Sequence, residues 1–132
     1  MLCGSREFIA RAHRIRKMAG GGMRQVGMLA AAGIYALDYH VDRLAQDHAL
    51  ARRLAEGLAD VPGLLVEPPH TNILFADLVG SAKERSAELI QYLKERGILA
   101  TGLYRLRFVT HLDVDAAGID RAIAAIARFF MA

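Results

Sequence analysis

The sequence changes character at Val61-Pro62-Gly63, and this change restricts the chain to folds that join helices to a small sheet. Before it, apolar residues recur at helical spacing; after it, short apolar runs bounded by Gly and Pro alternate with helical segments. From residue 64 the expected order is strand, strand, helix, strand, strand, helix, which predicts an α+β arrangement with helices on one face of the sheet. We therefore expect a helical segment, residues 1–60, and a small α+β subdomain, residues 61–132.

Three helices are expected in the first part, over residues 6–18, from 23 or 24 to 37, and over 41–59. Ser5 is placed to cap the first helix, and the glycines at 20–22 end it. The second helix is apolar on nearly all sides, which predicts that it packs against a part of the protein outside this chain. The third carries one apolar stripe and is typical of a surface helix.

In the second part, strands are expected over residues 64–66, 72–78, 98–100 and 106–110. Ser81 and Glu84 have capping-box spacing before a helix that runs to about residue 96. Asp113 or Asp115 is expected to cap the last helix. We expect strands 72–78 and 106–110 to share one sheet, with the last helix packed across it. The apolar stripe of that helix consists of Ile119, Ile123, Ile126 and Phe130, of which Ile123 and Ile126 should be buried.

Composition excludes a disordered tail, because 54% of the residues are hydrophobic and only 23% are charged. The longest stretch without charge, residues 25–37, is shorter than the roughly 20 apolar residues that cross a bilayer, so we expect no membrane partner. Cys3 is the single cysteine and has no partner for a disulfide. These features predict a reducing, cytoplasmic location.

Positive charge is concentrated in residues 1–24, which hold six basic side chains against Glu7. Such a segment is compatible with a nucleic acid, an acidic partner or a phosphorylated small molecule, or with a solvated helix face. No interleaved aromatic residues or known nucleic-acid motif accompany it. A small basic nucleic-acid-binding module therefore stays an alternative, and the favoured interpretation expects no nucleic acid.

The glycine-rich turn at residues 20–25 (GGGMRQ) opens a helix, so its backbone N–H groups and Arg24 could bind an anion such as a phosphate. Its spacing matches neither a P-loop nor a dinucleotide fingerprint. From these residues alone, a glycine hinge between two helices is the favoured interpretation.

Arg107 lies on an otherwise apolar strand and needs a partner for its five N–H donors. A bound carboxylate would satisfy it bidentately, whereas an internal ion pair with Asp or Glu is the commoner case. Arg105 points to the same side and could be the exposed member instead. His111 and Asp113 are expected to make local contacts, and the histidine spacing predicts no metal site.

Four blocks together resemble the low-specificity L-threonine aldolase family, in the same order and over essentially the whole chain. They are residues 16–25 (RKMAGGGMRQ), residues 30–37 (AAAGIYAL) with Asp47-His48, residues 71–75 (TNILF), and residues 107–114 (RFVTHLDV).

The resemblance implies a pyridoxal phosphate enzyme of fold type I, the aspartate-aminotransferase fold, here represented by a helical connecting segment and the small C-terminal α/β subdomain. Family members are homotetramers with active sites between subunits, and they split threonine or allo-threonine into glycine and acetaldehyde. By resemblance, Lys17 and Arg24 lie near the cofactor phosphate, and Arg107 holds the carboxylate of the amino-acid substrate.

The chain departs from the family pattern at the lysine that attaches the cofactor as a Schiff base, which the family carries upstream in a Ser-Lys-Gly-like stretch. The three lysines here, Lys17, Lys83 and Lys94, have no such setting. No catalytic residue is therefore assigned, and the chain alone is expected to be inactive, as the C-terminal part of a longer enzyme. The remaining alternative within this fold is a related β-eliminating lyase or hydroxymethyl transferase.

Overall fold

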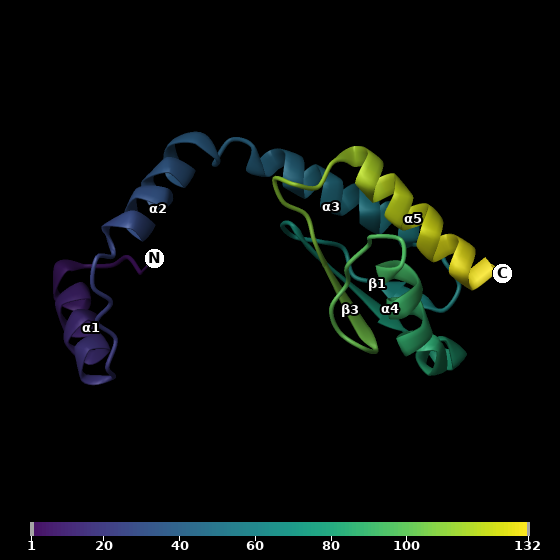
Figure 1. Cartoon of the computed structure of the whole chain (residues 1–132), viewed down its shortest axis with the longest axis horizontal. Helices are drawn as coiled ribbons and strands as arrows, with labels where there is room; N and C mark the ends of the chain where they lie inside the picture. The colour runs from purple at the N-terminus through teal and green to yellow at the C-terminus, as the bar shows by residue number, and fades with distance from the viewer. Residues whose placement is uncertain (1, 132) are drawn as a thin grey trace. The chain divides into compact units, whose positions relative to one another are not determined.

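The computed structural model describes residues 2–131, which divide into two compact units, one that ends at residue 40 and one that begins at residue 41 (Figure 1). The division lies upstream of the boundary expected near residue 60. Helix α3 (Leu44–Leu58) belongs to the second unit because it packs on the first two strands of the sheet. No helix within residues 2–131 combines the length and the apolarity that crossing a membrane requires.

The first unit contains α1 (Arg6–Met18) and α2 (Gly27–Tyr39). The Ser5 hydroxyl accepts a hydrogen bond from the Phe8 N–H at 3.2 Å, which confirms the predicted cap of α1. Helix α2 begins later than expected, because residues 24–26 form a turn in which Gln25 has a φ of +53°. No residue of α2 is buried, and Met28 is 82% exposed. That α2 packs against another part of the protein stays a prediction.

The second unit is built on an antiparallel sheet of β1 (Leu64–Val66), β2 (Ile73–Leu78) and β3 (Arg105–Val109), in the order β1-β2-β3. The prediction that strands 72–78 and 106–110 share one sheet is therefore confirmed. The expected strand at residues 98–100 was wrong. That segment lies between Gly97 and Gly102, both with positive φ, and Thr101 after it makes an isolated bridge to β3.

The helices of the second unit are α3, the short 3-10 helix η1 (Gly80–Arg85), α4 (Ser86–Lys94) and α5 (Ala116–Met131). The capping box at Ser81 and Glu84 was wrong, because both residues lie inside η1 and α4 begins only after it. Asp115 caps α5, since its Oδ1 accepts a hydrogen bond from the Gly118 N–H at 2.7 Å.

One face of the sheet carries the core and the other is open. Leu74, Ala76 and Leu78 of β2, with Leu106 and Phe108 of β3, are buried under α3, α4 and α5. The intervening residues point to the open face. Along α5 the buried residues are Ile119, Ala122, Ile126 and Phe129, so the expected stripe is rotated slightly and Ile123 is only half-buried. The reason is that α5 packs beside both α3 and α4, and Ile123 lies against Gly57 of α3 at the edge of that contact.

This difference predicts unequal costs for two alanine substitutions on the same helix. Ile126 is 0% exposed, so Ile126→Ala should lower the free energy of unfolding by about 2–5 kcal/mol. Ile123→Ala should cost less, because its side chain keeps contact with water. Urea unfolding of the 132-residue chain checks both values, and a larger loss for Ile123→Ala would contradict the observed packing.

Candidate functional site

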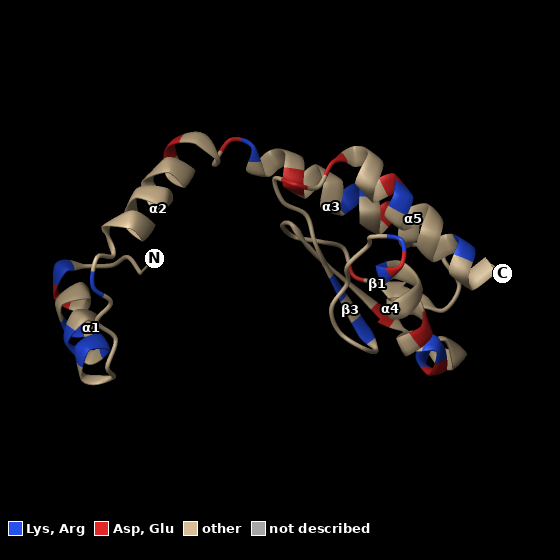
Figure 2. Cartoon of the chain, in the orientation of Figure 1, with Lys and Arg blue, Asp and Glu red and all other residues tan. Residues whose placement is uncertain are grey.

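Two of the candidate site residues belong to the first unit: Lys17 lies near the end of α1, and Arg24 lies within the glycine-rich turn that follows. The Nζ atom of Lys17 lies 3.1 Å from the position that a Cβ atom would take on Gly22, so a larger residue there would displace the ammonium group. Both side chains are exposed, and neither forms an ion pair with any residue that the structure describes. Two cationic groups at this turn are therefore available to an anion. Figure 2 shows in blue the Lys and Arg positions along α1 and on the loop that follows it.

Hydrogen bonds within the turn reduce the number of backbone N–H groups that the predicted anion site can use. The Gly21 N–H donates to the Arg16 carbonyl at 2.8 Å and the Gly20 N–H to the Lys17 carbonyl at 3.2 Å, so both amides serve to end α1. The start of α2 has no side-chain cap within residues 2–131. Its first N–H groups, with the positive end of the helix dipole, are the donors left for an anion.

The third candidate, Arg107, lies on the open face of the sheet in the second unit. It is exposed, faces Phe75 across the β2–β3 pair, and bonds through its backbone to Thr101. Its guanidinium makes no hydrogen bond or ion pair with residues 2–131. Lys17 and Arg24 belong to the first unit, and Arg107 belongs to the second.

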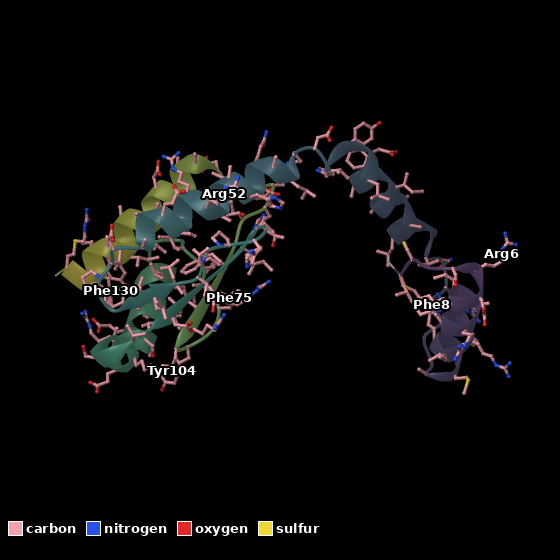
Figure 3. All side chains as sticks on the ribbon, turned by 180° about the vertical axis from the view of Figure 1, so that it is seen from behind. Arg6, Phe8, Arg52, Phe75, Tyr104 and Phe130 are labelled. Carbon is pink, nitrogen blue, oxygen red and sulfur yellow. The ribbon has the colours of Figure 1, made fainter. Side chains whose placement is uncertain are left out.

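Arg105, and not Arg107, forms the internal ion pair that the sequence suggested as one alternative. Its Nη2 lies 2.8 Å from Glu67 Oε2 and its Nη1 lies 3.4 Å from Asp77 Oδ2. Its Cζ lies 4.5 Å from the centre of the Phe75 ring. Figure 3 labels Phe75 on the sheet of the second unit. Arg105 is the paired arginine and Arg107 the unpaired one. Sequence reasoning missed Glu67 and Asp77, because only the strand register shows that Asp77 stands opposite Arg105.

A set of buried and partly buried hydrogen bonds fixes the end of β3 just beyond Arg107. The Thr110 hydroxyl, in a residue that is 2% exposed, donates to the Asp47 carbonyl at 2.6 Å. The Asn72 side-chain amide donates to the Thr110 carbonyl at 2.8 Å, and Arg43 pairs with the Asp47 carboxylate at 2.9 Å. These bonds connect β2, β3 and α3. Asp47, Asn72 and Thr110 all lie in the resemblance blocks, but their residue types alone did not predict the connection.

Thr110→Val should therefore destabilise the second unit although it preserves the shape of the side chain. Removing the hydroxyl leaves the buried Asp47 carbonyl without this donor, which should cost about 1–3 kcal/mol in the free energy of unfolding. Thr101→Val, at an exposed position, is the matched control and should change stability little. Equal effects in urea unfolding would show that this hydrogen bond does not hold the strand.

The remaining candidates have local roles or none. The Asp113 N–H donates to His111 Nδ1 at 3.3 Å, as expected for a local contact. Lys83 and Lys94 lie exposed on η1 and at the end of α4. Within residues 2–131, no three or more His, Cys, Asp or Glu side chains are grouped so that they could hold a metal ion.

Comparison with known sequences gives a family for most of the chain. The sequence profile of the family described as beta-eliminating lyase matches residues 1–81. The low-specificity L-threonine aldolase of Escherichia coli strain K12 is 46% identical over 132 residues, which is all of this chain and 38% of that relative. The chain thus spans well under half the length of this relative.

Comparison with solved structures identifies the fold of the chain. Serine palmitoyltransferase of Sphingomonas wittichii superposes with a TM-score of 0.61 at 23% identity, over 75% of this chain and 27% of that one. A C-DES mutant with glycine covalently linked to its pyridoxal phosphate cofactor gives a TM-score of 0.59 at 19% identity, over 76% and 28%. These likenesses confirm the predicted fold class, the small α+β subdomain of the type I fold.

Proposed function

The chain belongs to the beta-eliminating lyase family, and we propose that it forms part of a pyridoxal-phosphate-dependent L-threonine aldolase, a lyase that splits threonine or allo-threonine into glycine and acetaldehyde. The observation that carries this proposal is the 46% identity to the Escherichia coli low-specificity enzyme over every residue of the chain. The chain covers 38% of that relative, and we assign the other catalytic groups to the remaining part of the enzyme.

Lys17 and Arg24 are proposed to hold the cofactor phosphate. Their cationic groups are exposed, and the free N–H groups at the uncapped start of α2 add further donors for a phosphate dianion. Gly22 has no side chain, which leaves room for the Lys17 ammonium group beside the turn. Pyridoxal phosphate, when bound, would accept the electron pair that is released when the Cα–Cβ bond of the substrate breaks.

Arg107 is proposed to bind the substrate carboxylate. It is an exposed arginine with no partner among residues 2–131, on the open face of the sheet, and its planar fork matches a carboxylate bidentately. Such a pair would fix the orientation of the amino acid and leave the breaking of the bond to other groups.

The attachment of the cofactor is assigned to a lysine outside these 132 residues. Lys83 and Lys94 are on the surface of the second unit, and Lys17 is proposed for the phosphate. The whole protein is proposed to be a homo-oligomer. The support for this is α2, whose exposed apolar residues, among them Leu29, Ile34 and Leu37, need cover from other parts of the protein.

A chimera tests the function directly. This chain replaces the 46%-identical segment of the Escherichia coli enzyme, and the product is assayed for acetaldehyde and glycine from threonine. We expect cleavage of threonine, with the unmodified Escherichia coli enzyme as the control. A chimera that retains the cofactor but eliminates a β-substituent from serine or cysteine, and leaves threonine intact, would indicate a related β-eliminating lyase instead.

Arg24→Ala in this chimera should weaken cofactor retention before it affects the chemistry. Loss of one charge-assisted hydrogen bond, at about 1.5–3 kcal/mol, predicts roughly tenfold or greater weakening of pyridoxal phosphate binding. Equilibrium dialysis against free cofactor gives the dissociation constant. Arg11→Ala, another exposed arginine of the same unit, is the matched control. Equal dissociation constants for the two variants would remove Arg24 from the phosphate site.

A further inference from the structure

We propose that Arg105 is a positioning residue for the substrate carboxylate, because it pairs with both carboxylates of the open sheet face and thereby keeps Arg107 unpaired. This inference rests on the carboxylate-binding role proposed for Arg107. It assigns to Arg105 an effect that depends on charge balance and on no contact with the substrate.

The strand register places both acidic groups close to Arg107. The Glu67 N–H donates to the Phe75 carbonyl at 3.0 Å, and Phe75 stands opposite Arg107, so Glu67, Phe75 and Arg107 form one row across the open face. Asp77 stands opposite Arg105 in the next row. Asp77 is thus a diagonal neighbour of Arg107, at a Cα separation of roughly 7–8 Å that an arginine side chain can span.

Arg105 connects the two rows. Its guanidinium lies over the Phe75 ring, with Cζ 4.5 Å from the ring centre, and reaches Glu67 at 2.8 Å on the far side while contacting Asp77 at 3.4 Å. A fork of fixed N–H donors can serve two carboxylates at once, which a single ammonium group does less well. Both negative charges of this face therefore have a partner other than Arg107.

Without Arg105, Arg107 would be the only arginine of the open face available to pair with Glu67 and Asp77. The two carboxylates would compete with the substrate for the Arg107 guanidinium, and the remaining negative charge would repel the substrate carboxylate. Ion pairs at this exposure are weak and are screened by salt, so the competition should be moderate and strongest at low ionic strength.

Steady-state kinetics of the chimera test the inference. Arg105→Met should raise KM for threonine roughly two- to fivefold, with kcat nearly unchanged and a larger effect at low salt. Adding Glu67→Gln and Asp77→Asn to that variant should bring KM back towards the starting value. A purely structural role for Arg105 predicts the opposite, a further loss with each added substitution.

Chemical modification gives a readout that needs no activity. In the 132-residue chain without substitutions, phenylglyoxal should react faster at Arg107 than at Arg105. The Arg105→Gln substitution should slow the reaction at Arg107, because Glu67 and Asp77 are then free to pair with Arg107. Mass spectrometry of tryptic peptides measures both rates. Faster modification of Arg105 than of Arg107 in the chain without substitutions would overturn the inference.

The two proposals fail in different ways. If Arg107→Ala leaves KM for threonine unchanged, the carboxylate assignment of the proposed function is wrong. If Arg107→Ala raises KM while Arg105→Met does not, or if the triple substitution fails to restore KM, only the role of Arg105 is overturned.

Discussion

Arg107→Ala and Arg107→Lys should both lower kcat/KM for threonine in the chimera, by roughly tenfold or more. The two hydrogen bonds of a bidentate guanidinium–carboxylate pair contribute about 1.5–3 kcal/mol each, and each 1.4 kcal/mol corresponds to a factor of ten. Lysine keeps the charge but loses the fork, so it should recover only part of the loss. The absorbance of the bound cofactor should stay intact in both variants, because Arg107 is assigned to the substrate alone.

The control for this prediction is Arg53→Ala. Arg53 is also exposed and lies in the second unit, but its guanidinium already makes a two-point pair with Asp120, at 2.9 and 2.7 Å. Its removal should leave kcat/KM nearly unchanged. A near-normal kcat/KM for Arg107→Ala, or an effect confined to folding, would make Arg107 a structural residue and the site assignment wrong.

The 132-residue chain by itself should neither cleave threonine nor retain pyridoxal phosphate after gel filtration. Its three lysines include two on the surface of the second unit, and the third is assigned to the phosphate, so none is placed to attach the cofactor covalently. Borohydride reduction in the presence of the cofactor, followed by peptide mapping, should show no single labelled lysine. Stoichiometric labelling of Lys17, Lys83 or Lys94, with cleavage of threonine, would contradict this expectation.

Elements with strong local signals could be predicted from the sequence. The Ser5 cap and the glycines that follow α1 define that helix at both ends, and alternating residues define β2 and β3. The start of α4 could not be predicted, because Ser81 and Glu84 have the spacing of a cap but lie in a 3-10 helix. The buried stripe of α5 depends on its neighbours α3 and α4, which is why Phe129 is buried rather than Phe130.

The candidate site was only partly predictable for a similar reason. Residue type marked Arg105 and Arg107 as two arginines on one side of a strand, but which of them is paired depends on the register with β2. Asp77 is far from both in sequence and becomes a neighbour only through that register. Glu67 is reached only because Arg105 extends over Phe75. Contacts of this kind follow from tertiary structure and have no local sequence signal.

A crystal structure of the chimera with glycine bound tests the central claim most directly, because glycine carries the carboxylate that Arg107 is proposed to hold. We predict both terminal nitrogens of the Arg107 guanidinium within hydrogen-bond distance of the two carboxylate oxygens, with Arg105 still paired to Glu67 and Asp77. A glycine carboxylate held by other residues, with Arg107 paired to Asp77 or Glu67 or directed into solvent, would contradict it.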